Sequence, residues 1–444
     1  MTRKRFISSL AFFVLISLLV VAPVLLSSNI RYFSIIYAII IPILLLTTKA
    51  PYLYLTRLWN FWLFIIINII AVFIYIYIDD RSSVINLIIL TLSYVSIFYL
   101  VSKGMEVCGE IVFVNLIFKY IGWILIIAFL VSPVLTLLHW PANAPEYFPW
   151  EAFYDDKRLL LVIGQHVGHS NSLWLMAFTA AFVMSNEFRK NRHWKIGIIL
   201  LVLFLILGLI LTKSRLALIF IGILMIAWLS YNRIIPKPLY AVIVLIIPLL
   251  YFGSIAIPSV TDRTIALVEN VQSNLPSVRI SASSHLQGAA SVYTGRHALN
   301  IMLMGAVIER PLFGVGHSDD RMRFGVNKEG SIAYGNDMMA TTESGLRMLA
   351  KYGIIYYSLL ILFVITPILR AARGYYNDNI FVISVCGIIL LSGIGTSIFE
   401  NLYGLNGLYV VILLMFHIMR PYTGSAKANL RFRTVVKLSS KGAS

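Results

Sequence analysis

Apolar runs of about 20 residues recur along the chain and alternate with shorter polar segments. A helix of that length crosses the ~30 Å hydrocarbon core of a bilayer. Strands of a membrane barrel would instead alternate in units of about 10 residues. The pattern therefore predicts an all-α polytopic membrane protein with about 12 transmembrane helices. The predicted spans are 8–26, 32–48, 58–78, 84–101, 112–138, 171–185, 196–211, 216–230, 238–257, 352–369, 379–398 and 402–419.

The composition excludes several other classes of protein. Hydrophobic residues make up 59% of the chain and charged residues only 12%, whereas soluble domains carry about 45–50% and about 25%. A soluble enzyme, a disordered chain and a secreted disulfide scaffold are therefore excluded. The two cysteines, Cys108 and Cys386, are far apart and form neither a disulfide framework nor a zinc site. The basic N-terminal residues precede an apolar run without a small-residue cleavage site, which indicates an uncleaved first helix.

The basic residues predict the orientation. With the N-terminus in the cytoplasm, 20 of the 36 lysines and arginines fall on the cytoplasmic side, opposed there by only 4 acidic residues. This asymmetry is what the positive-inside rule requires, and it predicts that both termini are cytoplasmic. The net charge of +17 is therefore a signal of topology and does not indicate nucleic-acid binding.

The predicted organisation has four parts. Residues 1–257 hold nine helices and a short outer segment at 139–170, and residues 258–351 form a large outer loop. Residues 352–419 hold three more helices, and 420–444 form a basic cytoplasmic tail. A loop of ~90 residues without structure would be unusual.

Part of this outer loop has a helical pattern. Apolar residues at helical spacing predict a helix from Arg296 to Glu309, and Pro311 ends it. Gly314 and Gly316 predict a turn. Residues 317–340 are polar and predict an irregular loop.

Two arginine-containing segments are the first candidates for chemistry. Thr212-Lys213-Ser214-Arg215 occupies a tight outer turn, where the cations either reach lipid phosphates or clamp a lipid-linked phosphate. Arg296, after Gly295, opens the predicted outer helix and either belongs to a capped surface helix or faces the substrate. Arg279 and Arg263 lie upstream and are weaker candidates.

The next candidate precedes the tenth span. In Thr341-Thr342-Glu343-Ser344-Gly345-Leu346-Arg347, Glu343 either stabilises the first helical turn and pairs with Arg347, or acts as a general base. His169 and Asn171, before the sixth span, are polar helix-entry residues or substrate contacts, and His317 is a further contact candidate. No metal-binding, Walker or dinucleotide motif is present in the sequence.

These motifs, in this order, resemble the O-antigen polymerase/ligase superfamily. The family typically has Thr-x-Ser-Arg, then an arginine with an amphipathic helix, then Asp-x-Pro-Leu-Phe-Gly-Val-Gly. The corresponding residues here are Thr212 to Arg215, Arg296, and Glu309 to Gly316, and the Gly168-His169-Ser170-Asn171 turn is also similar. The strong resemblance covers about 165–355.

One departure bears on the branch of the family. Ligases usually carry a His-Asn or His-Ser pair before the last motif, where this chain has Thr342-Glu343-Ser344. The ligase histidine has no counterpart, which favours the polymerase branch.

The resemblance implies a bacterial inner-membrane glycosyltransferase that uses undecaprenyl-diphosphate-linked oligosaccharides at the periplasmic face. It implies catalysis by Arg215, Arg296 and Glu343 without a metal or cofactor, with Arg279, His169, Asn171, His317 and Arg347 binding substrate. Membrane lipids, a chain-length regulator and a flippase of the same pathway would be its partners. The alternatives are an O-antigen ligase that transfers glycan to the lipid A core and, from a different class, a transporter of lipid-linked glycans.

Overall fold

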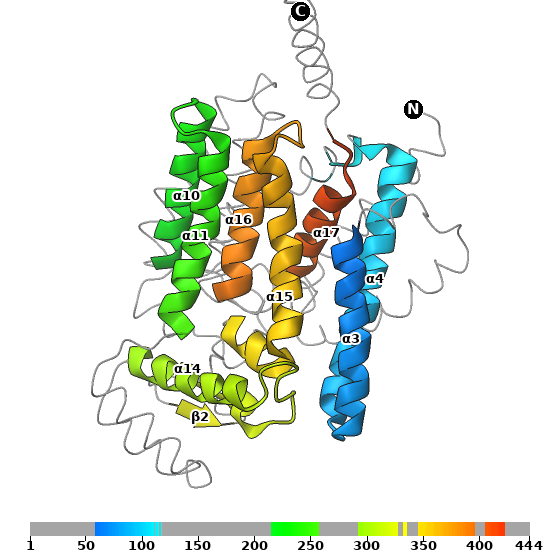
Figure 1. The fold of residues 1–444 in the computed structure, drawn as a ribbon, viewed down its shortest axis with the longest axis vertical. Helices are drawn as coiled ribbons and strands as arrows, with labels where there is room; N and C mark the ends of the chain where they lie inside the picture. The colour runs from blue at the N-terminus through cyan, green and yellow to red at the C-terminus, as the bar shows by residue number, and fades with distance from the viewer. Residues whose placement is uncertain are drawn as a thin grey trace, which may run out of the picture.

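The computed structural model describes residues 58–110, 112–114, 117, 215–256, 292–326, 332–334, 345–395 and 405–421. Over these residues the protein is a bundle of helices with one helix laid across its end (Figure 1). The predicted spans 8–26, 32–48, 171–185 and 196–211, and most of 112–138, lie outside the described residues.

The bundle helices agree with the apolar runs of the sequence. They are α3 (Trp59–Tyr77), α4 (Arg81–Cys108), α10 (Arg215–Tyr231), α11 (Lys237–Ala256), α15 (Gly345–Ala372), α16 (Asn379–Gly395) and α17 (Leu405–Ile418). Among the described residues, 3 helices are long and apolar enough to cross a membrane, namely those at Trp59–Tyr77, Arg81–Glu106 and Gly345–Ala372. The described part is thus compatible with a helical membrane protein, and the total of twelve spans stays a prediction.

Local signals explain the limits of α4. The Asp80 carboxylate accepts a hydrogen bond from the Ser83 N–H at 3.0 Å and so caps the helix, which begins three residues before the predicted span. The helix ends at Gly109, whose φ of 86° suits glycine and whose N–H donates to the Met105 carbonyl.

The outer-loop segment contains more regular structure than predicted. Helix α14 (Val292–Glu309) lies across the end of the bundle (Figure 1). It begins four residues before Arg296, because the helix accommodates Gly295 internally, so Arg296 lies in its second turn. Residues 317–340 are also not wholly irregular: a 3₁₀ helix (η3, Asp320–Arg323) leads into strand β1 (Phe324–Val326), which pairs antiparallel with β2 (Ile332–Tyr334).

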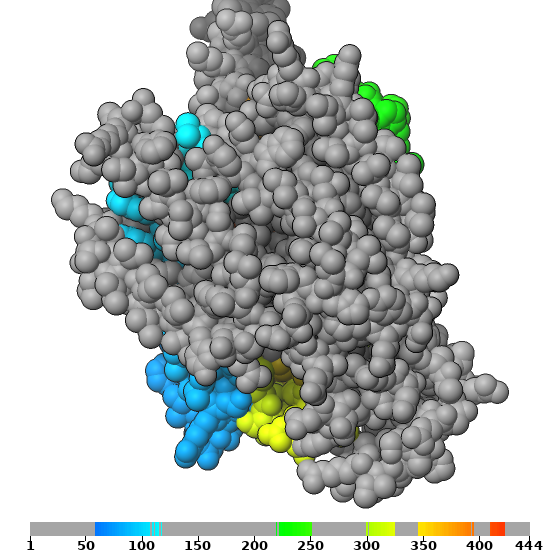
Figure 2. Space-filling model, turned by 180° about the vertical axis from the view of Figure 1, so that it is seen from behind, coloured from blue at the N-terminus to red at the C-terminus, as the bar shows by residue number. Residues whose placement is uncertain are grey.

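Contacts between the turns show that the connections of the bundle lie at its two opposite ends. At one end, the α3–α4 turn contacts the loop that follows α14, and we call this the α14 end. At the opposite end, Tyr231 bonds to Asp378, Tyr375 to the Met419 carbonyl, and Arg420 to Glu110. The described turns therefore fall at two opposite ends of the bundle, and their sides of a membrane stay a prediction. The surface view from behind also shows the α3–α4 hairpin, in blue, beside the yellow atoms of the region around 300–350 (Figure 2).

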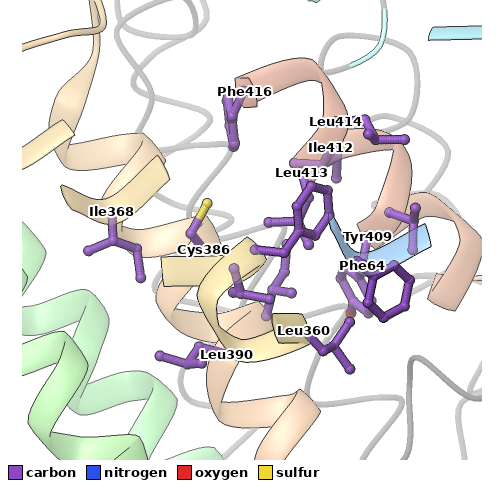
Figure 3. Close-up of a cluster of buried hydrophobic side chains, with 14 of the residues drawn as sticks. Phe64, Leu360, Ile368, Cys386, Leu390, Tyr409, Ile412, Leu413, Leu414 and Phe416 are labelled. Atoms are coloured by element: carbon purple, nitrogen blue, oxygen red, sulfur yellow. The ribbon is translucent and has the colours of Figure 1, made fainter. Parts of the chain in front are cut away.

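The core lies where α15, α16 and α17 meet, and α3 adds to it. Leu360, Cys386, Leu390, Tyr409 and Leu413 are all buried there (Figure 3). Lipid tails are as apolar as these side chains, so close packing rather than escape from water drives such association. Gly387 illustrates it: a Cβ on this residue would collide with Val244 of α11. The only cysteine described as free, Cys386, is sealed in this core within the described part of the chain.

Candidate active site at the α14 end

Helix α15 is broken near its start. Gly353 has φ 80° and ψ 175°, which is far from helical geometry. The break leaves the N–H groups of Ile354 and Ile355 without their helical acceptors, and the carbonyls of Ala350 and Lys351 without their donors. Four unpaired backbone groups at a buried site would be costly.

The loop that follows α14 supplies partners for all four groups. Ile354 N–H donates to the Pro311 carbonyl at 2.8 Å and Ile355 N–H to the Leu312 carbonyl at 3.4 Å. In return, the Val315 N–H donates to the Ala350 carbonyl at 2.9 Å, and the Gly316 N–H to the Lys351 carbonyl at 3.1 Å. Residues 311–316, which we call the docked loop, therefore complete the broken helix.

Three glycines make this docking possible. Gly314, Gly316 and Gly353 have φ values of 73°, 86° and 80°, a region that disfavours side chains. A Cβ on Gly314 would collide with the Lys351 carbonyl, and one on Gly353 with the Leu312 carbonyl. The Pro-Leu-Phe-Gly-Val-Gly motif thus has a physical role: it is the segment that fits the helix break.

The end of α3 also fastens the docked loop. The Tyr75 hydroxyl donates to the Lys351 carbonyl at 2.6 Å, and it also lies within hydrogen-bond reach of the Phe313 carbonyl. Tyr75 is fully buried. One side chain of α3 therefore contacts both sides of the junction between the docked loop and α15.

The start of α4 holds the residues just after the docked loop. The Asp80 carboxylate accepts hydrogen bonds from the Ser318 N–H at 3.3 Å and from the hydroxyls of Ser318 and Ser83. The Ser83 hydroxyl accepts the His317 N–H at 2.6 Å. Burial alone would raise the pKa of Asp80, but the hydrogen bonds from Ser318 and Ser83 outweigh it and hold the pKa below its usual value. Asp80 is therefore an ionised anchor at neutral pH.

His317 is held through its ring as well as its backbone. The ring Nε2 lies 3.2 Å from the Tyr352 hydroxyl, and the two ring centroids are 6.0 Å apart at a steep angle. Tyr352 is buried and packs on Tyr356, with centroids 4.8 Å apart. His317 itself is half-buried. It is thus an oriented histidine at the end of the docked loop.

A charged cluster joins η3 to the end of α14. The Arg321 guanidinium contacts Glu309 at 2.6 Å and Asp319 at 2.7 Å. Hydrogen bonding to Asp319 raises the pKa of Arg321, burial opposes this, and Glu309 adds to the rise. Burial would raise the pKa of Asp319, but the bonds from Arg321 lower it overall. The guanidinium of Arg347 donates to the Met322 carbonyl, which ties the first part of α15 to the same segment.

The structure places three of the predicted site residues, Arg296, His317 and Arg347, in elements at the α14 end. Arg215 is the first residue of α10, whose last residue, Tyr231, bonds to Asp378 at the opposite end, so the backbone of Arg215 lies toward the α14 end. Arg296, His317 and Arg347 belong to the α14-end elements described above. Glu343, Arg279, His169 and Asn171 lie outside the described residues. Within the described ranges, no group of three or more His, Cys, Asp or Glu side chains could hold a metal ion.

A comparison with protein families gives the segment an identity. Residues 199–355 match the family model described as O-antigen ligase. This match supports membership of the chain in the O-antigen polymerase/ligase superfamily. The resemblance deduced from the motifs is therefore confirmed. Members of this superfamily are glycosyltransferase-like enzymes, and the match does not separate polymerases from ligases.

The matched segment coincides with most of the site. It contains α10, α11, α14 and the docked loop, and it ends at Ile355, just after the break in α15. Tyr75, Asp80 and Ser83, which hold the docked loop from the side, lie outside it. Neither the comparison with curated proteins nor that with solved structures gave a match.

Sequence reasoning did not select Tyr75, Asp80, Ser83 or Arg321. Asp80 and Ser83 carry a signal that could have been used, because an Asp three residues before a Ser at the start of an apolar run indicates an N-cap. That signal predicts the cap alone. The contact of Asp80 with Ser318 joins residues 238 positions apart, and no local pattern encodes it.

Proposed function

We propose that the protein is an O-antigen polymerase, or a polymerase of a related surface polysaccharide. It transfers a growing glycan from undecaprenyl diphosphate to a lipid-linked repeat unit. The observation that carries this proposal is the arrangement of the family segment: α14 carries Arg296, the docked loop fixes the start of α15 with Arg347, and the first residue of α10, Arg215, points its end of the helix toward the α14 end.

The proposed membrane placement has twelve spans, cytoplasmic termini and an α14 end that faces the periplasm. Basic residues support it, because Lys103, Arg233, Arg373 and Arg420 all belong to the opposite end. Positive charge of this kind is typical of cytoplasmic loops. Reporter fusions at residues 300 and 430 test the placement. They should report opposite sides of the membrane, and a shared side would refute it.

The proposed chemistry is a single displacement at an activated sugar. A lipid diphosphate lies at headgroup depth because its isoprenoid chain stays in hydrocarbon, so cations that bind it belong at that depth. Arg215 and Arg296 would neutralise the charge that develops on the departing diphosphate, where preorganised cations contribute most. Their planar guanidinium groups bind phosphate oxygens in pairs. Glu343 is the general base that the sequence suggests for the acceptor hydroxyl.

The remaining candidates complete the substrate site in this proposal. Arg279, His169, Asn171, His317 and Arg347 contact the two lipid-linked glycans. No metal or cofactor takes part, and the partners are membrane lipids, a flippase that delivers the repeat units and a chain-length regulator.

Thr342-Glu343-Ser344 at the place of the ligase histidine pair supports a polymerase over a ligase. The lipopolysaccharide banding of a strain without the gene tests this choice. Loss of the ladder with one repeat unit retained on the core is the result expected for a polymerase. Loss of all O-antigen from the core would show a ligase, and accumulation of units on the cytoplasmic side would show a transporter.

A further inference from the structure

His317 is held in a way that a solvated surface histidine does not need. Its N–H donates to Ser83, the next residue is bonded twice to Asp80, and its ring meets Tyr352. Gly316 before it has no Cβ, which lets the Asp80 carboxylate approach the backbone closely. The backbone is thus fixed on one side by α4, and the ring is fixed on the other side by α15.

The position of His317 is also that of a reactive group. It stands where the docked loop meets the start of α15, a segment that follows Glu343 and carries Arg347. It is half-buried, so its ring is oriented by protein without being sealed from substrate. An imidazole has an ordinary pKa near 6.5, so it changes protonation state close to neutrality.

We propose that His317 is the catalytic base of the transfer reaction. The inference rests on the proposed function and assigns the proton-transfer step to His317 in place of Glu343. The acceptor hydroxyl oxygen bonds to the anomeric carbon of the donor sugar while its proton passes to the imidazole ring. The bond from that carbon to the diphosphate oxygen breaks, and the diphosphate leaves with the electron pair. The imidazolium then returns its proton to water.

The neighbouring groups favour this role. The Tyr352 hydroxyl, 3.2 Å from Nε2, orients the ring. The Asp80 carboxylate fixes the backbone of this segment, through Ser83 to the His317 N–H and directly to the Ser318 hydroxyl. The titratable and charged groups on the elements packed around His317 include Tyr75 of α3, Asp80 before α4, Arg347, Lys351 and Tyr352 of α15, and Arg310, Asp319, Asp320 and Arg321 of its own segment.

The experiment uses the purified full-length protein in lipid nanodiscs. The substrate is the undecaprenyl-diphosphate-linked repeat unit extracted from a strain that lacks the gene. His317→Gln should lower kcat about 10²-fold or more with little change in KM, and the acidic limb of the pH–rate profile should disappear. In His317→Ala, free imidazole should restore part of the rate, which a purely structural defect would not allow. His193→Gln, in a predicted cytoplasmic loop, is the matched control and should behave as wild type.

Three results would overturn the inference while leaving the proposed function intact. The first is wild-type kcat in His317→Gln. The second is a slow His317→Gln enzyme that keeps the acidic limb and shows no rescue of His317→Ala by imidazole. The third is loss of that limb in Glu343→Gln but not in His317→Gln. If His317→Gln fails to fold, as judged by its thermal unfolding midpoint, His317→Asn takes its place. Absence of transfer by the wild-type protein would instead defeat the proposed function itself.

Discussion

The hydroxyl of Tyr75 lies 2.6 Å from the carbonyl oxygen of Lys351, 276 residues further along the chain. The break at Gly353 leaves this carbonyl without its helical donor, and it also accepts a hydrogen bond from the N–H of Gly316. A helix far from the family segment thereby stabilises the junction on which that segment depends. The site is built from the α3–α4 hairpin as much as from the family motif.

Tyr75→Phe tests that junction. The substitution keeps the ring and removes the hydroxyl, so we expect a loss of about 0.5–1.5 kcal/mol in the free energy of unfolding. Transfer should also fall, because the start of α15 is less firmly held. Thermal unfolding and transfer rate are both measured in detergent.

Tyr376→Phe is the matched control for Tyr75→Phe. It removes a similar bond, from the Tyr376 hydroxyl to the Phe416 carbonyl at 2.7 Å, but at the opposite end. It should cost similar stability and leave transfer intact. Equal losses of transfer in the two variants would contradict the role given to Tyr75.

Gly316→Ala should disrupt the docked loop. Alanine at a φ of 86° costs about 1–2 kcal/mol, and its Cβ would also collide with the Asp80 carboxylate and the Ser83 hydroxyl. Gly374→Ala separates the two effects, because Gly374 has a similar φ of 79° and open space around it. We expect a clearly larger drop in unfolding temperature for Gly316→Ala. A drop no larger than that of Gly374→Ala would remove the steric argument.

The sequence predicted the helices well because their signal is local. Apolar length alone located α3, α10, α11 and α16 to within a few residues of their observed ends. Apolar periodicity located the helix before Pro311, and the two glycines located the turn at Gly314. These features depend on residues within one or two turns of each other, which is the range over which periodicity carries information.

The site was less predictable because its contacts are long-range. Glycine in the Pro-Leu-Phe-Gly-Val-Gly motif indicates a turn, but the reason for the second glycine is a carboxylate that belongs to Asp80. Gly353 lies in the middle of an apolar run, and its break is stable only because Pro311 and Leu312 supply acceptors. The hairpin of β1 and β2 was missed for a different reason: its strands are only three residues long.

The ionisation of Asp80 should make the stability of the fold depend on pH. Its folded-state pKa is lowered from an ordinary value of 3.8, so the native state binds the ionised form more tightly than the unfolded state does. The contribution of Asp80 to stability is fully present at pH values above 3.8 and is lost as the pH falls through the lowered pKa. Asp80→Asn should therefore be less stable than wild type at pH 7, and the difference should shrink below about pH 4. Unfolding midpoints measured against pH check this, and a difference that is constant with pH would refute it.

Transfer should not require a divalent metal. The proposed mechanism assigns the neutralisation of the diphosphate to arginines, and its leaving group is already activated. Treatment of the purified protein with EDTA should leave kcat unchanged. The control is a parallel sample with added Mg²⁺, which should show the same rate. A strict requirement for Mg²⁺ or Mn²⁺ would count against the arginine-based mechanism.

Arg215→Lys and Arg296→Lys test the arginine-based mechanism directly. Lysine keeps the charge but loses the planar fork that binds two phosphate oxygens at once. If these side chains stabilise charge on the departing diphosphate, each substitution should lower kcat on the order of 10²-fold and affect KM less.

Arg233→Lys is the control for both arginine substitutions, because Arg233 lies in the α10–α11 turn at the opposite end, and it should keep the wild-type rate. The placement of Arg296 in the second turn of α14, instead of at its first residue, makes its result the more informative of the two. A side chain there reaches substrate only if one face of α14 borders the site. A wild-type rate for Arg296→Lys would leave Arg296 as a surface residue of α14, and the diphosphate would then depend on Arg215 alone.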